Sequence, residues 1–294
     1  MRQAVRMLSL VVAVPGCLGA AELKVAVLHP LLADVAQAVG GERVEVVNLG
    51  GPGADPHKFE PGPKELQAAQ GAQLYFVSGK GLEPYLGKLR DIVGGEKVVE
   101  VGASLPTLKA ETLCDHGGHA HVHETDDPHW WHSTDCWRRA ARVVAKELAK
   151  ADPAGAEGYG KRSRQYRRKM EELERWARGE LAKVPEERRV LATAHAAFGY
   201  FCHDFGWRQL PVQGLNREQV PSPKFVSEVA AVIRTEKVGA VFPEKRSNPK
   251  MLQTIAKETG VKVGEALIAD GSGSVEGMFR HNVKAIVAAL APAH

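Results

Sequence analysis

The chain has 294 residues, a formal net charge of +4, 25% charged residues and 44% hydrophobic residues. This length is sufficient for two compact domains, and the composition is that of an ordinary globular protein. The net charge is too small, and the basic residues are too scattered, to indicate a protein that binds nucleic acid.

Residues 1–21 have the pattern of a secretory signal peptide. Arg2 and Arg6 form a basic start, residues 7–14 are an apolar run, and small residues up to Ala21 provide a cleavage region. The apolar run is too short to span a membrane. Cleavage before Cys17, as in a bacterial lipoprotein, is the alternative. Either reading predicts an exported protein.

Three cysteines follow the signal peptide, namely Cys114, Cys136 and Cys202. In the oxidising compartment that export implies, an odd number allows one disulfide and one free thiol. Cys114 and Cys136 flank the same loop and are therefore the preferred pair. Three buried thiols are the alternative.

Strands and helices alternate through residues 22–150, which we assign to an N-terminal α/β lobe. Such alternation is typical of a parallel sheet covered by helices. Apolar and β-branched runs predict strands, and apolar residues at helical spacing predict helices. The predicted strands are 23–28, 44–49, 74–77 and 97–101, and the predicted helices are 31–39, 63–70, 83–93 and 136–150.

Residues 102–127 interrupt this alternation. The segment is polar and acidic, has no apolar periodicity, and is predicted to be a loop. Its part from 115 to 127 is rich in histidine, with His116, His119, His121 and His123. The spacing defines no single geometry, so we expect weak, exchangeable metal binding there. A solvated polar loop without a role is the alternative.

Residues 151–184 form a long, highly charged stretch with apolar residues at helical spacing. Because α/β segments flank it on both sides, we expect a helix that links two lobes; a surface helix of a single domain is the alternative. Residues 185–294 are assigned to a C-terminal α/β lobe. Its predicted strands are 190–193, 238–242 and 261–263, and its predicted helices are 198–205, 223–235, 249–259 and 275–290.

Three histidines stand beside breaks in the regular pattern. His57 and His129 each end an Asp-Pro-His segment, and His195 lies in a Thr-Ala-His-Ala-Ala-Phe segment. Each follows a strand or loop and precedes a helix, which in an α/β lobe is where ligands bind. Any one of them alone is more simply an ordinary polar or core histidine. Together they predict a metal site, since imidazole suits zinc and three imidazoles leave a fourth position.

Five segments of the chain resemble the periplasmic metal-binding proteins of bacterial ABC importers, in the zinc-specific ZnuA-like branch. They occur in the family's order and at similar separations, and the resemblance covers essentially the whole mature chain. It implies two α/β lobes with mostly parallel sheets, joined by one long rigid linker helix, with the metal site in the cleft between the lobes. The segments are residues 54–61, 127–130, 194–201, 260–264 and 278–283.

The resemblance implies that His57, His129 and His195 are metal ligands. It also implies a fourth, acidic ligand beyond the last strand. Reading without gaps from residues 260–264 places this ligand at Asp270, with Glu265 and Glu244 as alternatives. Manganese-uptake relatives typically carry Glu where His195 stands, so a three-histidine site favours Zn²⁺.

The chain departs from the family pattern directly after Trp130. The family usually has Leu-Asp-Pro there, whereas this chain has Trp131, His132 and Ser133. We expect Ser133 or Thr134 to replace the lost helix cap. His132 is predicted to be an auxiliary ligand or a group that supports the ligands.

The resemblance implies a binding protein and not an enzyme. It would capture Zn²⁺ in the periplasm and deliver it to the membrane permease of an ABC importer. A periplasmic zinc chaperone is a further candidate partner, and we expect a monomer. A manganese- or iron-binding relative or an adhesin on the same fold is one alternative. A zinc hydrolase is another, because a catalytic zinc has three protein ligands and a water. The chain contains no HExxH helix, and Asp270 as a fourth ligand would close the site.

Overall fold

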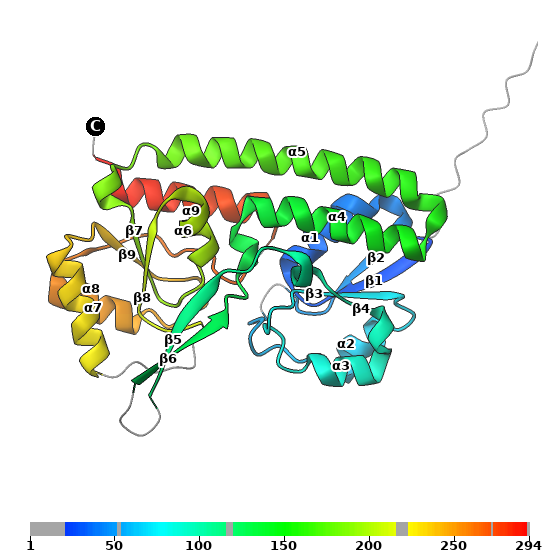
Figure 1. Cartoon of the computed structure of the whole chain (residues 1–294), viewed down its shortest axis with the longest axis horizontal. Coiled ribbons are helices and arrows are strands. Elements are labelled where there is room, and N and C mark those ends of the chain that lie inside the picture. The colour runs from blue at the N-terminus through cyan, green and yellow to red at the C-terminus, as the bar shows by residue number, and fades with distance from the viewer. Residues whose placement is uncertain (1–20, 52–53, 116–119, 216–222, 272, 293–294) are drawn as a thin grey trace, which may run out of the picture.

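The computed structural model describes residues 21–51, 54–115, 120–215, 223–271 and 273–292. Two α/β lobes lie at opposite ends of an elongated molecule, and the long helix α5 (Ala156–Leu181) runs along both of them (Figure 1). The predicted signal peptide up to residue 20, with Cys17, and the loop residues His116 and His119 lie outside the described residues. In the described part, no helix is long and apolar enough to cross a membrane.

The N-terminal lobe is built on a parallel sheet with the strand order β2-β1-β3-β4. All four residues of β3 are buried, as expected for a parallel strand covered on both faces. Because the strands are parallel, their carboxyl ends meet at one edge, which faces the other lobe (Figure 1). The elements are β1 (Leu23–Val27), α1 (Pro30–Gly40), β2 (Val44–Asn48), α2 (Pro63–Ala68), β3 (Leu74–Val77), α3 (Leu86–Val93) and β4 (Val98–Glu100).

The C-terminal lobe repeats this plan with the strand order β10-β9-β7-β8. Gly260 directly follows α8, and its φ of 72° is the left-handed conformation of a helix stop. Strand β8 was not predicted, because it carries a charged residue and a proline, which the edge of a sheet tolerates. The elements are β7 (Val190–Thr193), α6 (Gly199–Phe205), β8 (Arg208–Pro211), α7 (Pro223–Thr235), β9 (Ala240–Phe242), α8 (Lys250–Thr259), β10 (Lys262–Val263) and α9 (Val275–Leu290).

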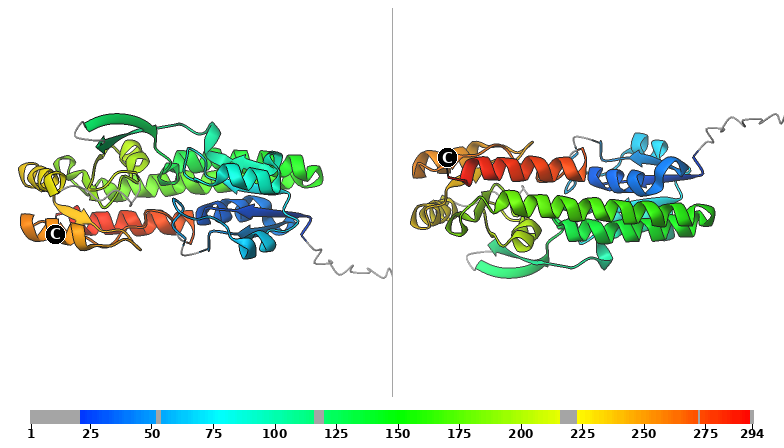
Figure 2. Two further views of the ribbon diagram at one scale, coloured as in Figure 1. Left: turned by 90° about the horizontal axis from the view of Figure 1, so that it is seen from below. Right: turned by 90° about the horizontal axis from the view of Figure 1, so that it is seen from above.

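The segment predicted to be a loop instead contains an antiparallel hairpin of β5 (Lys109–Asp115) and β6 (Ala120–Asp126). It projects from the body of the molecule as a curved ribbon (Figure 2). The prediction was wrong because a two-stranded ribbon away from the core needs no alternating apolar face. Tyr200 of α6 anchors its base, because the hydroxyl accepts a hydrogen bond from the Leu108 N–H and donates one to the Pro106 carbonyl.

Helix α5 packs against α4 (Thr134–Ala151), α1 and α9, and thus against helices of both lobes. Figure 2 shows α1 and α9 end to end beside it. Arg162 of α5 donates hydrogen bonds to the carbonyls of Val39 and Gly40 at the end of α1. These contacts make α5 the predicted linker helix, and they oppose free motion of one lobe against the other.

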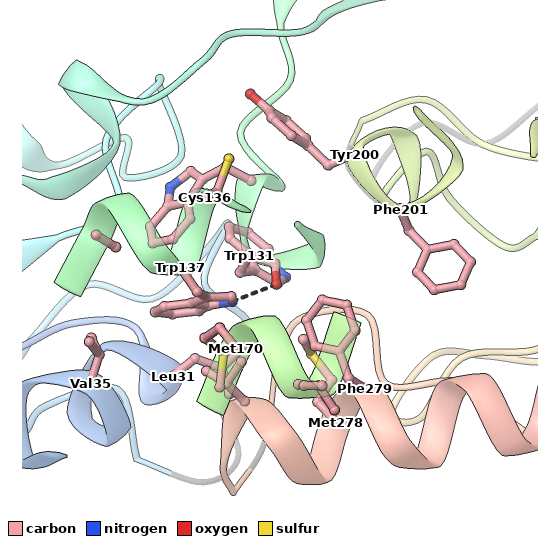
Figure 3. Packing of buried hydrophobic residues seen from close by; sticks show 14 of the residues in the cluster. Leu31, Val35, Trp131, Cys136, Trp137, Met170, Tyr200, Phe201, Met278 and Phe279 are labelled. Atoms are coloured by element: carbon pink, nitrogen blue, oxygen red, sulfur yellow. Dashed lines mark hydrogen bonds between the residues drawn. The ribbon is translucent and has the colours of Figure 1, made fainter. Parts of the chain in front are cut away.

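One continuous apolar cluster joins the two lobes beneath α5. Trp131 and Trp137 lie at its centre, and Trp137 Nε1 donates a hydrogen bond to the Trp131 carbonyl at 2.8 Å (Figure 3). Met170 of α5 and Phe279 of α9 belong to the same cluster (Figure 3). The lobes therefore share a core as well as a helix.

Cys136 and Cys202 are buried free thiols, so the predicted disulfide between Cys114 and Cys136 is not formed. Cys136 lies in the first turn of α4 and faces the core, and burial raises its pKa to about 12. Burial also raises the pKa of Cys202. Thiols that stay protonated in an apolar setting are poor nucleophiles.

Candidate metal centre

His57, His129, His195 and Asp270 converge between the lobes. One ligand atom from each lies within 4.8 Å of those of the others. The Nε2 atoms of His57 and His129 are 3.1 Å apart, and Asp270 Oδ1 lies 3.7 Å from His57 Nε2 and 3.6 Å from His195 Nε2. Donors 2.0–2.1 Å from one tetrahedral ion are separated by about 3.3 Å. The four side chains are thus spaced to share a single ion.

The two Asp-Pro-His segments fold in the same local way. The N–H of His57 donates to Asp55 Oδ1 at 3.0 Å, and the N–H of His129 donates to Asp127 Oδ1 at 2.9 Å. Aspartate favours this turn because its short carboxylate reaches the backbone two residues on. The repeated sequence therefore directs both histidines out of their loops toward the cleft.

Asp127 also binds the ring of His129. Its Oδ1 lies 2.8 Å from Nδ1 of the imidazole, and both side chains are buried. This contact puts the ring proton on Nδ1 and leaves the lone pair of Nε2 for a metal. Burial lowers the pKa of His129, which keeps the imidazole neutral and able to ligate.

Glu244 holds His195 in the same manner from the second lobe. Its Oε1 accepts the backbone N–H of His195 at 2.8 Å, and its Oε2 lies 2.6 Å from His195 Nδ1. Burial lowers the pKa of His195, but the carboxylates of Glu244 and Asp270 outweigh it and raise the pKa to about 10. Glu244, an alternative fourth ligand from the sequence, thus lies behind His195 and outside the four-residue cluster.

Glu265 and His132 are also not members of the four-residue cluster. The side chain of Glu265 is 66% exposed and lies 3.8 Å from His281 Nδ1. His132 is buried, and its Nε2 donates a hydrogen bond to the Ala269 carbonyl at 2.7 Å. Ser133 caps α4 by accepting the Cys136 N–H at 3.2 Å, which confirms the predicted replacement of the cap.

His29 lies beside the site and was not among the residues predicted from the sequence. Its Nδ1 accepts the N–H of Leu31 at 3.2 Å and so caps α1, and its ring packs on Trp131 with 4.4 Å between centroids. Burial lowers its pKa to about 3. The signal available was His29 before Pro30 at the end of a strand, because proline favours the first turn of a helix.

The arrangement suits a divalent cation. Asp127, Glu244 and Asp270 are buried carboxylates around the three imidazoles, and a positive ion among them offsets their burial. His195 Nε2 is buried and has no hydrogen-bond partner among the residues that the structure describes. A pocket of about 290 Å³, lined by Asp55, Lys245 and other residues of both lobes, reaches Asp270.

Comparison with known proteins identifies the family of the chain. Residues 25–289 match the family described as zinc-uptake complex component A, periplasmic, or ZnuA. The manganese-binding lipoprotein MntA of Bacillus subtilis is 32% identical over 283 residues, which cover 92% of this chain and 90% of that protein. The iron-binding protein YfeA of Yersinia pestis is 29% identical over 258 residues, which cover 88% of this chain and 81% of that protein.

A solved structure has the same fold. The periplasmic zinc-binding protein TroA from Treponema pallidum superposes with a TM-score of 0.81 at 27% identity, covering 92% of this chain and 100% of that one. The two-lobed architecture predicted from the sequence is thereby confirmed. The proteins of this group are not enzymes, and their metals differ from one relative to the next. The chain therefore belongs to the ZnuA family, the metal-binding, substrate-binding components of ABC metal importers.

Proposed function

We propose that this protein captures Zn²⁺ in the periplasm and delivers it to the permease of an ABC importer. The observation that carries the proposal is the third imidazole, His195, which Glu244 orients toward the other donors. Three neutral nitrogens and one carboxylate oxygen are a donor set that suits zinc, and the affinity order of divalent ions favours Zn²⁺ over Mn²⁺ and Fe²⁺ at nitrogen ligands.

The proposed ligands are Nε2 of His57, His129 and His195, and a carboxylate oxygen of Asp270. Four protein donors complete a tetrahedral shell and leave no position for an activated water. Such a closed site suits an ion that is carried and released. The proposed carrier acts as a monomer, with a periplasmic zinc chaperone as a further candidate partner.

A manganese carrier is the second candidate, because a relative 32% identical to this chain is named a manganese-binding lipoprotein. Mn²⁺ is a harder ion that favours oxygen donors, so it would need water or the second oxygen of Asp270 in its shell. Only one of the four proposed donors is a carboxylate, which favours zinc.

Competition between the two ions tests the proposal. The metal-free protein, prepared with EDTA, would be titrated with Zn²⁺ and Mn²⁺ against a chelating dye. We expect one tightly bound Zn²⁺ per chain and displacement of bound Mn²⁺ by an equal amount of Zn²⁺. Equal affinities, or a preference for Mn²⁺, would overturn the zinc assignment and leave metal import in place.

Whether the mature protein is released or anchored to a membrane by a lipid is a separate part of the proposal. We propose a periplasmic protein released by cleavage near Ala20 or Ala21, with acylation at Cys17 as the alternative that the lipoprotein MntA supports. The intact mass of the mature protein from the native host distinguishes the two. An added diacylglycerol on an N-terminal cysteine would establish the anchored form.

A further inference from the structure

The carbonyl of Ala269, the residue before Asp270, accepts two side-chain hydrogen bonds. Trp131 Nε1 and His132 Nε2 each donate to it at 2.7 Å. A carbonyl oxygen has two lone pairs, so these donors occupy both. They belong to the short helix η5 (Trp130–His132), which directly follows His129. The backbone that carries Asp270 is thus held by the segment that carries another proposed ligand.

His132 is also in contact with the segment of a third proposed ligand. Its ring packs on Phe198, with 4.4 Å between centroids, and Phe198 lies three residues after His195. The imidazole is 1% exposed, and burial lowers its pKa to about 3, so it remains a neutral donor. Because its Nε2 carries a proton toward Ala269, that atom has no lone pair for a metal.

Gly271 and Val275, beyond Asp270, lie against helix α1 of the N-terminal lobe. Gly271 has a φ of 77°, and a Cβ there would lie 2.7 Å from Leu31 Cγ of α1. The N–H of Val275 donates to Asp34 Oδ2 of α1 at 3.1 Å. The backbone is therefore restrained on both sides of Asp270. Before it, Asn282 holds both backbone groups of Ile268, and Trp131 and His132 hold the carbonyl of Ala269, the residue next to Asp270.

We infer that His132 is a positioning residue, which holds the Ala269 carbonyl and thereby aims the carboxylate of Asp270 at the metal. The inference rests on the proposed ligand set. A ligand must be held within about 0.5 Å of its productive position, and groups that orient ligands typically change metal affinity about 10- to 100-fold when lost. It gives a role to the Trp-His-Ser segment at which the chain departs from the family pattern.

The variant His132→Phe keeps a ring against Phe198 and removes the donor to Ala269. We expect its Kd for Zn²⁺, measured by competition with a chelating dye, to rise about 10- to 100-fold. The same substitution in the Asp270→Ala background should change Kd less than about twofold, because the residue it acts through is gone. A general weakening of the fold would instead act equally in both backgrounds.

Two further variants control the experiment. His281 also donates from Nε2 to a backbone carbonyl, that of Ala266 at 2.8 Å, so His281→Phe is the matched control and should retain the parent Kd. His132→Gln retains an N–H donor and should recover most of the affinity that His132→Phe loses. With Co²⁺ in the site, the visible absorption of His132→Phe should shift from that of the parent toward that of Asp270→Ala, since the Asp270 carboxylate is no longer held in position.

The results test the proposed ligand set and the role of His132 separately. If Asp270→Ala binds Zn²⁺ as the parent does, the proposed ligand set is wrong. If Asp270→Ala weakens binding but His132→Phe does not, or does so equally in both backgrounds, the inference about His132 is overturned and the ligand set stands. Should His132→Phe fail to fold, Trp131→Phe removes the other donor to the same carbonyl and must show the same dependence on Asp270.

Discussion

The carboxylate of Glu244 contacts both the backbone and the ring of His195. It accepts the backbone N–H at 2.8 Å and lies 2.6 Å from Nδ1, and neither side chain is exposed. Asp127 makes the same double contact with His129, at 2.9 and 2.8 Å. In both cases Nδ1 keeps its proton against a carboxylate, so Nε2 is the nitrogen that faces the shared site and can bind a metal. The two lobes thus orient one histidine each by the same chemistry.

Replacing Glu244 by Gln should weaken zinc binding about 10- to 100-fold, because the amide cannot accept at both of its terminal atoms. Chelator competition measures the change in Kd. Glu265→Gln, at an exposed acidic position in the same lobe, is the control and should leave Kd unchanged. Parent-like affinity in Glu244→Gln would mean that orientation of His195 does not limit binding.

Removing a proposed ligand should have a larger effect than removing a partner of one. We expect His195→Ala to raise the Kd for Zn²⁺ more than about 100-fold, which is the upper end for orienting groups. Asp270→Ala should raise it less than His57→Ala or His129→Ala, because three imidazoles remain and water can fill the gap. If His195→Ala binds zinc like the parent, the site is assigned wrongly.

Zinc binding should release about one proton near neutral pH. The neighbouring carboxylates raise the pKa of His195 to about 10, so the metal-free site carries a proton that the ion must displace. Affinity should therefore fall by about tenfold for each unit that the pH decreases. Calorimetry at one pH in buffers of different ionisation enthalpy counts the protons.

Two results would contradict this prediction. One is an affinity that stays flat between pH 8 and pH 5, since protonated imidazole cannot bind a metal. The other concerns the metal-free protein, where a pKa raised from 6.5 to about 10 stabilises the fold below pH 6.5. That stability should be lost as the pH rises toward 10, and thermal unfolding that shows no such loss across this range would count against the raised pKa.

Deleting residues 116–123 should leave the tight zinc site intact, because none of the four clustered side chains belongs to the β5–β6 hairpin. The deletion should reduce the number of weakly bound ions counted by calorimetry. A matched variant replaces His116, His119, His121 and His123 with Asn and so keeps the chain length. Loss of the tight site in both variants would show that the hairpin takes part in it.

Much of the architecture could be predicted from the sequence. Short apolar runs indicate buried parallel strands, and apolar residues at helical spacing indicate amphipathic helices. The run 74–77 and the helix 275–290 were predicted with their observed limits. The Asp-Pro-His segments contributed to the prediction of a metal site because their histidines stand beside breaks in the regular pattern, and the structure shows that the aspartate two residues earlier organises each turn locally. These features depend on residues that are neighbours in the chain.

Other features depend on residues that are distant in the chain, and only the tertiary structure decided them. The carboxylate of Glu244 meets His195 from 49 residues away, and Trp131 meets the Ala269 carbonyl from 138 residues away. From the sequence, Glu244 and Asp270 were both acidic candidates for one position. Pairing of β7 with β9 within the C-terminal sheet placed Glu244 behind His195, and the loop after β10 placed Asp270 among the proposed ligands. A carboxylate becomes a ligand or a support according to which atoms surround it, and those atoms come from separate segments brought together by the shared core.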